Sequence, residues 1–337
     1  MTFLYQRKQR VIGISLIVIS LTLHLATVAV YHRQPDIFAA FIVFPIWFWG
    51  ILGTGLSAFA YWAFRAPLSL VTSAIWAFTV FVFADETLPL GRVGKESPKP
   101  GTPTRHEGEN VLRVATINWN SSPGNFSPTI VKYQPDVVCI QEIAHPYRLR
   151  QLNDSLYGGK GDYRYDAVKR CGILVRGEIK HHFKHSFCRG QQILARFPSG
   201  EEVAIVNLHL TAASTDMRLW EPECWKTHRR NRKVRRQELA TAMHLLRKFP
   251  FYSSKPAIVA GDFNGPSNER FYNVIHKEMT DTFSAVGVGW PNTYHQRVPL
   301  LRLDRIFASS ELGPVRSRAV TVPESDHRMV ISDLVFQ

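Results

Sequence analysis

Cysteine is scarce in this sequence, and its four cysteines lie far apart. None has CxxC spacing or the zinc-like spacing to histidine, which excludes a metal cluster held through sulfur. Cys139 lies in the apolar run DVVCIQE and is expected in the core. Cys171 and Cys188 flank an expected hairpin, and they could form a disulfide if this part of the chain is outside the cytoplasm.

Acidic side chains are also few, with 27 Asp and Glu against 41 Lys and Arg, so the formal net charge is +14. Residues 110–337 alone hold 32 basic and 21 acidic side chains, a net charge of +11. This balance favours a polyanionic partner or a membrane surface. Internal repeats and low-complexity tracts are absent, so nothing in the sequence indicates a repeat architecture.

Charge is almost absent from much of the first quarter of the chain. A bilayer core of roughly 30 Å needs about 17–25 helical residues. Interface-type aromatics, among them Trp47 and Trp62, lie in the second of three apolar stretches. We therefore expect a bundle of about three transmembrane helices in residues 1–84. The three stretches cover residues 11–31, 37–62 and 68–84.

The orientation follows from the basic residues near the first stretch. Arg7, Lys8 and Arg10 form the only basic cluster beside it, and the positive-inside rule places such a cluster in the cytoplasm. Three crossings would then put the rest of this integral membrane protein on the extracytoplasmic or periplasmic side. The same cluster before an apolar run is also typical of a signal peptide, here over residues 1–31.

Residues 85–110 are rich in proline, glycine and charge and are expected to form a flexible linker. Beyond them the sequence changes to short, β-branched apolar runs of strand length, such as VLRVATIN and AIVAGDFN. Leu239, Met243 and Leu246 have helical spacing. Many strands and few helices predict two sheets packed face to face, with helices outside.

Polar side chains stand at the ends of these apolar runs, where several strands can converge on one pocket. Carboxylate and amide oxygens suit Mg²⁺ or Mn²⁺ rather than zinc. Two histidines and further aspartates suit phosphoryl chemistry, which needs water activation and stabilisation of charge on phosphoryl oxygens. The residues are Asn118, Asn120, Glu142, His209, Asp262, Asn264, Asp304, Asp326 and His327.

Each motif has a common structural explanation when taken singly; GDFN, for example, is more often a turn than a site. In the order TIN, QE, NLHL, GDFN, LDRIF, SDH, however, the set resembles the endonuclease/exonuclease/phosphatase superfamily, also called DNase I-like. That superfamily includes abasic-site endonucleases, inositol polyphosphate phosphatases and neutral sphingomyelinases. The resemblance covers about residues 110–337. It implies a four-layer α/β sandwich over residues 111–337, with a divalent-metal phosphoesterase site at the common edge of two central sheets.

The resemblance also implies a role for each residue. Glu142 matches the main metal-binding carboxylate, Asp326 a further carboxylate beside the metal, and Asn118, with Asn120 next to it, the amide that contacts metal and phosphate.

In the same comparison Asp262 matches the residue that orients or deprotonates the attacking water. Asn264 matches the residue that holds the phosphate or the developing oxyanion, and His209 a histidine that contacts phosphate. His327 matches the histidine of the last motif, with Asp304 as its orienting partner.

The run WKTHRRNRKVRR, residues 225–236, concentrates positive charge between His209 and the expected helix. Tryptophan followed by Arg and Lys is typical of an interfacial loop on anionic lipid, and equally of a nucleic-acid contact. A solvated loop is the structural alternative. A nuclear-import signal is excluded by the expected membrane anchor. We predict that substrate binding involves Arg229, Arg230, Arg232 and Lys233.

The sequence thus predicts a membrane-anchored, Mg²⁺- or Mn²⁺-dependent phosphodiesterase acting on a phospholipid or another surface-bound phosphodiester. A nuclease is the first alternative, since the net charge also suits DNA or RNA. A catalytically inactive, phosphate-binding protein is a further alternative, although no residue of the motif set is missing. No obligate protein partner is inferred.

Overall fold

The computed structural model describes residues 2–94, 111–122, 128–183, 189–213, 216–248 and 255–337. The chain divides into two compact units, Met1–Thr87 with Asp216–Arg229, and Leu88–Thr215 with Arg230–Gln337. The expected linker begins differently from the prediction, because a short helix, α5 (Thr87–Gly91), lies in it.

Arg92, directly after α5, donates hydrogen bonds to the carbonyl oxygens of Ser284 (2.9 Å) and Gly287 (3.1 Å). The remainder of the expected linker lies outside the described residues.

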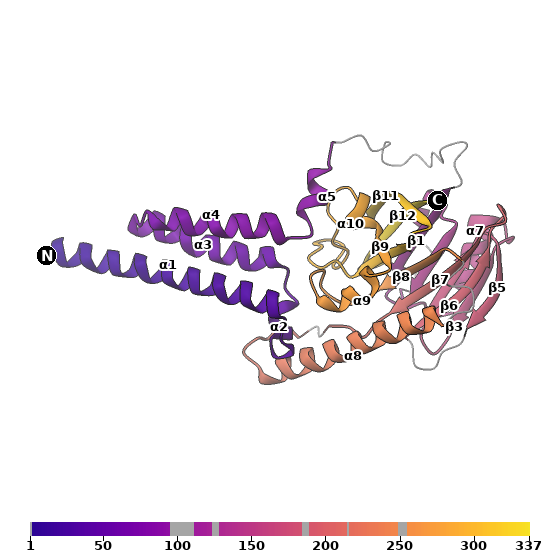
Figure 1. Ribbon diagram of the computed structural model, residues 1–337, viewed down its shortest axis with the longest axis horizontal. Helices are drawn as coiled ribbons and strands as arrows, with labels where there is room; N and C mark the ends of the chain where they lie inside the picture. Colours follow the sequence, from indigo (N-terminus) through magenta and orange to yellow (C-terminus); the bar gives the residue numbers. More distant parts are fainter. Residues whose placement is uncertain (1, 95–110, 123–127, 184–188, 214–215, 249–254) are drawn as a thin grey trace. The chain divides into compact units, whose positions relative to one another are not determined.

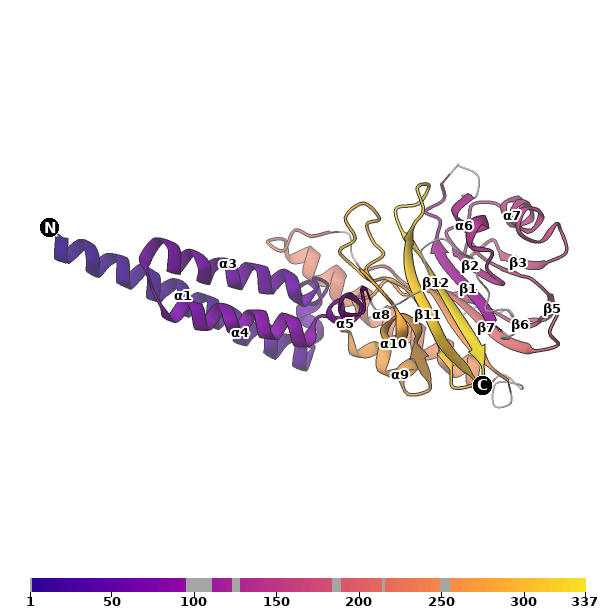
Figure 2. The ribbon, with the colours of Figure 1, turned by 90° about the horizontal axis from the view of Figure 1, so that it is seen from above.

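The first unit is helical. Its main helices α1, α3 and α4 lie side by side (Figures 1 and 2). Small polar side chains such as Ser20 and Ser57 are buried between them, together with the ring of Trp76, whose Nε1 donates to Ser20 Oγ at 3.0 Å. Large apolar side chains such as Phe59, Phe78 and Phe81 are exposed instead. The helices are α1 (Thr2–Arg33), η1 (Asp36–Phe38), α2 (Ala39–Ile42), α3 (Ile46–Phe64) and α4 (Leu68–Phe83).

Length and composition identify one clear membrane span, Arg7–Arg33, instead of the expected three. The second apolar stretch is not one helix, because Pro45 lacks the N–H that would continue the helical ladder, and the chain bends by 71° there. The helices on either side of this bend, Asp36–Ile42 and Ile46–Phe64, are long and apolar enough for a second span only if they are taken together. Helix α4 has 16 residues, fewer than the roughly 20 needed to cross a bilayer upright.

The second unit contains two six-stranded mixed sheets. Each sheet has one parallel pair at its centre, β1 with β2 and β7 with β8, and its other neighbours are antiparallel. In order across the first sheet, the strands are β11 (Leu312–Thr321), β12 (Arg328–Phe336), β1 (Val111–Asn118), β2 (Val137–Gln141), β4 (Cys171–Val175) and β3 (Asp162–Asp166). Those of the second are β5 (Glu178–Phe183), β6 (Gly190–Arg196), β7 (Glu202–His209), β8 (Ala257–Asp262), β10 (Asp304–Ser309) and β9 (Met279–Asp281).

The sheets pack face to face and carry helices on their outer faces, as Figure 2 shows. Strand β8 shows the reason: Ile258 and Ala260 face the other sheet, whereas Val259 packs with Leu239 and Met243 of α8 (Pro222–Arg247). Because both faces are buried, the central strands are almost continuously apolar.

The first sheet is covered in the same way by α6 (Pro128–Tyr133) and α7 (Tyr147–Tyr157). The second sheet carries, besides α8, the short helices η3 (Arg270–Tyr272) and α9 (Asn273–His276), and α10 (Thr282–Val286) follows β9. The layers are therefore helix, sheet, sheet and helix, as the sequence predicts.

Candidate active site

The two central parallel pairs place polar side chains at one edge of the unit. Asn118 is the last residue of β1, Glu142 follows β2, and His209 and Asp262 end the paired strands β7 and β8. The carboxyl ends of parallel strands are where ligands bind in open α/β sheets. Antiparallel β10 begins at this edge, with Asp304 opposite Asp262.

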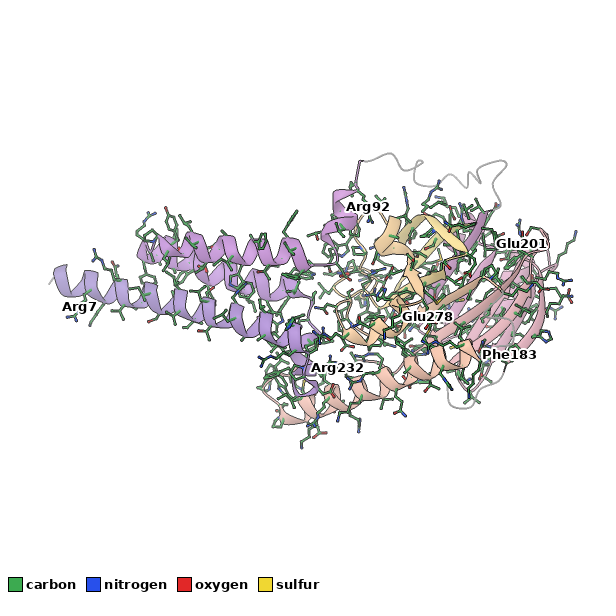
Figure 3. The ribbon with its side chains drawn as sticks, viewed as in Figure 1. Arg7, Arg92, Phe183, Glu201, Arg232 and Glu278 are labelled. Carbon is green, nitrogen blue, oxygen red and sulfur yellow. The ribbon has the colours of Figure 1, made fainter. Side chains whose placement is uncertain are left out.

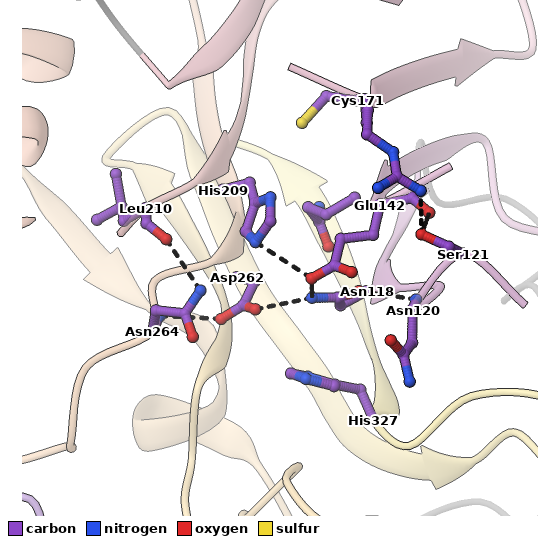
Figure 4. A network of polar contacts seen from close by, with 12 residues as sticks. Asn118, Asn120, Ser121, Glu142, Cys171, His209, Leu210, Asp262, Asn264 and His327 are labelled. Atoms are coloured by element: carbon purple, nitrogen blue, oxygen red, sulfur yellow. Dashed lines mark hydrogen bonds and ion pairs between the residues drawn. The ribbon is translucent and has the colours of Figure 1, made fainter. Parts of the chain in front are cut away.

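Asn118 links the two carboxylates of this edge. Its amide Nδ2 donates to Glu142 Oε1 and to Asp262 Oδ2, each at 3.0 Å, as Figure 4 shows. Its oxygen accepts the backbone N–H of Asn120 at 2.9 Å, and this contact fixes which way the amide points. In this arrangement Asn118 holds Glu142 and Asp262 in place instead of presenting its own oxygen to a cation.

Glu142 is half-buried and also faces His209, whose Nε2 lies 3.4 Å from Glu142 Oε1. Beside it, Arg170 Nη2 donates a hydrogen bond to the Ser121 hydroxyl. Asn120, Ser121, Glu142 and Arg170 all have positive φ, between 47° and 54°. Such backbone is uncommon for residues other than glycine and gathers at functional sites.

Asp262 and Asn264 form a tight turn after β8. Asp262 Oδ1 accepts the backbone N–H of Asn264 at 2.9 Å, and Asn264 Nδ2 donates to the Leu210 carbonyl at 2.9 Å. Asn264 has a φ of 52°. Its amide nitrogen keeps one further N–H, which is enough to contact an anionic oxygen.

His327 Nδ1 lies 2.7 Å from Asp304 Oδ2, and both residues are buried. The backbone N–H of Asp304 donates to Thr293 Oγ1, and the backbone N–H of His327 donates to Ser325 Oγ. The ring of Tyr294 lies over that of His327, with 5.0 Å between ring centres. The imidazole is thus fixed from two sides.

Charge around the imidazole changes its proton affinity. Burial alone disfavours the charged ring, but the Asp304 carboxylate, together with Asp262 and Asp326, raises the pKa of His327 well above its usual range. Burial also raises the pKa of the Tyr294 hydroxyl, and Asp326 and Asp262 raise it further. The carboxylates around His327 therefore favour the protonated form of its imidazole at neutral pH.

The donor set fits a divalent cation. Carboxylate oxygens of Asp262 and Asp304 lie within 4.8 Å of each other and of a ring nitrogen of His327. Because a protonated imidazole has no lone pair for a metal, only the carboxylates count as ligands here. Among the described residues, Asp304 Oδ1 and Asp326 Oδ1 are buried and accept no hydrogen bond. A buried carboxylate oxygen without a donor is satisfied by a cation or a proton. With Glu142 beside this group, the oxygen-rich set matches the preference of Mg²⁺ or Mn²⁺.

The basic run is placed differently from the expected loop, since it lies on helix α8 from its first turns onward. Arg229, Arg230 and Lys233 are exposed. Arg232, labelled at α8 in Figure 3, is buried and pairs with Glu269 at 3.1 Å, which corrects its prediction as a substrate contact. Within the described residues, no hydrogen bond or ion pair links Arg229, Arg230 or Lys233 to the residues of this edge.

Supporting residues that the sequence motifs do not reveal hold this edge together. Glu238 of α8 accepts hydrogen bonds from the backbone and hydroxyl of Thr211 at 2.7 and 2.8 Å, just after His209. Asp281 pairs with Arg302 (2.5 Å) and Arg305 (2.7 Å), which flank Asp304. Cys171 is a free, buried cysteine whose Sγ donates to the Lys169 carbonyl at 3.3 Å, so the structure does not support its predicted disulfide with Cys188, which itself lies outside the described residues.

Two mixed sheets with carboxylate, amide and imidazole groups at their common edge define an α/β protein equipped for metal and phosphate chemistry. A model of the Endonuclease/Exonuclease/phosphatase family matches residues 110–327. The chain therefore belongs to the endonuclease/exonuclease/phosphatase family. No curated protein matches the sequence.

Solved structures share the fold at low sequence identity. An endonuclease/exonuclease/phosphatase family protein from Bacteroides thetaiotaomicron is 16% identical with a TM-score of 0.55, covering 68% of this chain and 99% of its own. A mannosyl-6-phosphatase from Bacteroides thetaiotaomicron is 17% identical with a TM-score of 0.53, covering 67% and 100%. TDP2 from D. rerio, complexed with single strand DNA product, is 17% identical with a TM-score of 0.51, covering 67% and 99%.

Proposed function

We propose that this chain is a membrane-anchored phosphodiesterase that depends on Mg²⁺ or Mn²⁺. The observation that supports this most is the convergence of Glu142, Asp262, Asn264 and the His327–Asp304 pair at one edge of both sheets. Family membership supports phosphoester chemistry, and the buried carboxylate oxygens support a cation.

In this proposal each residue has a separate role in an in-line attack by water on phosphorus. Asp262, held by Asn118, accepts the proton of the attacking water. The free N–H of Asn264, His209 and the imidazolium of His327 contact the phosphoryl oxygens as negative charge grows on them. Glu142 and Asp326 would hold the cation, and Asn118, which accepts the backbone N–H of Asn120, fixes the position of the Glu142 carboxylate. When bound, this ion neutralises charge on the phosphate.

The anchor is the first unit. Many of its large apolar side chains, such as Phe59, Phe78 and Phe81, are exposed, whereas polar Ser20, Ser57 and Thr72 are buried, an arrangement unlike that of a water-soluble bundle. In this proposal α1 crosses the bilayer, with α3 and α4 lying against it. An anchored site favours a phosphodiester that is itself at the surface, such as a phospholipid head group. The catalytic unit is then on the extracytoplasmic side, because Arg7, Lys8 and Arg10 precede the span.

A nuclease is the second candidate. The TDP2 structure with its DNA product shares the fold, and the net charge of +14 suits a polyanion. An inactive phosphate-binding protein is the third.

The test uses the full chain in detergent with Mg²⁺ or Mn²⁺, on bis(p-nitrophenyl) phosphate, phospholipid vesicles, single-stranded DNA and RNA. Glu142→Gln, Asp262→Asn and His327→Gln should each lower turnover by about 10²–10³-fold, the usual cost of losing one preorganised group. Asp154→Asn, an exposed acid on α7, is the matched control.

Full turnover with EDTA would contradict the metal assignment. Cleavage of DNA but of no lipid would replace the lipid substrate by nucleic acid. Phosphate binding without turnover on any of these substrates would favour the binding protein.

A further inference from the structure

Helix α8 divides the basic run between two opposite faces. Arg232 and Arg235 point inward and both pair with Glu269, at 3.1 and 3.0 Å. Cys224 and His228 are buried on the same face, one turn apart. The positive charge of the run is therefore not a single patch, because part of it is neutralised inside the fold.

The outward face carries Lys226, Arg229, Arg230 and Lys233 at positions i, i+3, i+4 and i+7, a spacing that aligns them along one side of a helix. All four are exposed. Lys226 pairs with Glu223 at 3.4 Å, and both side chains are well exposed. In the part of the chain that the structure describes, the other three form no ion pair. This basic stripe spans about 10 Å of helix.

The segment before α8 carries an exposed tryptophan side chain. Trp220 is 77% exposed, although hydrogen bonds hold the loop around it in place. His228 Nε2 hydrogen-bonds the carbonyl of Asp216 at 2.9 Å, and Trp225 Nε1 donates to the carbonyl of Leu219 at 2.8 Å. Because the loop is built on the first turns of α8, the position of Trp220 is fixed relative to the basic stripe.

This segment belongs to the helical unit. Residues Asp216–Arg229 group with Met1–Thr87, and the Trp225 ring lies edge-on to that of Phe38, with 6.2 Å between ring centres. Phe38 follows shortly after Arg33, the last residue of α1. The end of a spanning helix marks the level of the lipid head groups, so the start of α8 stands at that level.

We propose that the exposed start of α8 binds anionic lipid head groups, with Trp220 in the interface and Lys226, Arg229 and Arg230 on the lipid phosphates. Exposed tryptophan beside aligned cations is the composition of an interfacial element. Continuity with α1 favours a lipid surface over nucleic acid. This inference rests on the membrane anchor of the proposed function and specifies the surface that the anchored unit contacts.

Hydrogen exchange in nanodiscs tests the inference on the full chain. Amides of residues 216–230 should exchange more slowly when phosphatidylglycerol is added to phosphatidylcholine. Juxtamembrane cations each strengthen attachment to an anionic surface, so Lys226→Gln/Arg229→Gln/Arg230→Gln should lower the equilibrium constant for attachment roughly 100-fold and abolish the added protection. Lys132→Gln/Lys160→Gln/Lys277→Gln removes the same charge from exposed positions elsewhere and should keep it.

A second readout does not depend on charge. Brominated lipid chains should quench the fluorescence component that Trp220→Phe removes, and an unquenched component would contradict its place in the interface.

Equal exchange with and without phosphatidylglycerol would overturn the lipid contact. Equal protection by single-stranded DNA in phosphatidylcholine discs would assign the surface to nucleic acid and also overturn it. Release of the chain from membranes by alkaline carbonate would contradict the anchor itself, which is a failure of the proposed function and separable from the other two results.

Discussion

The pair of His327 and Asp304 shows how a single buried contact sets the chemistry of the site. A raised pKa means that the fold stabilises the protonated imidazole. This stabilisation is fully present below the ordinary histidine pKa and is lost as pH rises through the raised value. The charged ring therefore persists through neutral pH, where a neutral ring would be a weaker partner for phosphate.

Asp304→Asn should remove the charge that holds this proton, since burial alone lowers the pKa of His327. Activity at neutral pH should fall roughly 10²-fold, and the alkaline limb of the kcat/KM profile should move to lower pH. The measurement is hydrolysis of bis(p-nitrophenyl) phosphate against pH at saturating Mg²⁺. A profile with an unmoved alkaline limb would show that His327 does not need its charge.

At the residue scale, the sequence predicts the members of the candidate site better than their contacts. It indicates which residues meet, because polar side chains at strand ends share one edge. It does not show that Asn118 bridges Glu142 and Asp262, nor that Thr293 and Ser325 hold the Asp304–His327 pair. These contacts depend on loops whose paths are set by packing across the whole unit, so spacing along the chain gives no sign of them.

At the scale of elements, the close contact between α3 and α4 depends on Gly53. A Cβ there would lie 1.9 Å from the Trp76 ring, whereas one at Gly55 would meet nothing within 4 Å. Gly53→Ala should therefore destabilise the helical unit by about 1–3 kcal/mol, the usual cost of overpacking. Gly55→Ala should not destabilise it. Thermal unfolding in detergent compares the two; equal transitions would mean that the helices do not pack here.

The central strands are predictable because both of their faces are buried. The sequence does not predict edge strands β3, β5, β9 and β11, since positions at a sheet edge admit polar residues that break the apolar run. It also does not predict the inner strand β12, because the buried polar residues Ser332 and Asp333 interrupt its apolar pattern. Helix α8 begins well before its apolar spacing at Leu239, because its first turns bury Cys224, His228, Arg232 and Arg235 instead. A segment with two buried, paired arginines has the same composition as a solvated loop. Only the position of Glu269, which pairs with both arginines, shows that this segment is a buried part of a helix.

At the scale of the whole molecule, the basic cluster Arg7, Lys8 and Arg10 competes with a basic catalytic unit. In the proposed membrane-anchored arrangement, residues close to the first span decide the orientation, because long domains translocate largely regardless of charge. Protease added to sealed, right-side-out membrane vesicles should therefore digest the catalytic unit and spare the N-terminus. Protection of the catalytic unit until the vesicles are opened would place it in the cytoplasm.

Because Asp216–Arg229 groups with the helices of Met1–Thr87, the two units are not separable by one cut. A shortened chain that begins after α5 would keep Trp225 but lose Phe38. The aromatic surface of Trp225 that Phe38 covers would then be exposed and would promote aggregation. Aggregation of such a fragment would then indicate loss of the contact between Phe38 and Trp225, not misfolding of the catalytic unit. Removing the anchor cleanly would also mean replacing Trp225 by a polar residue.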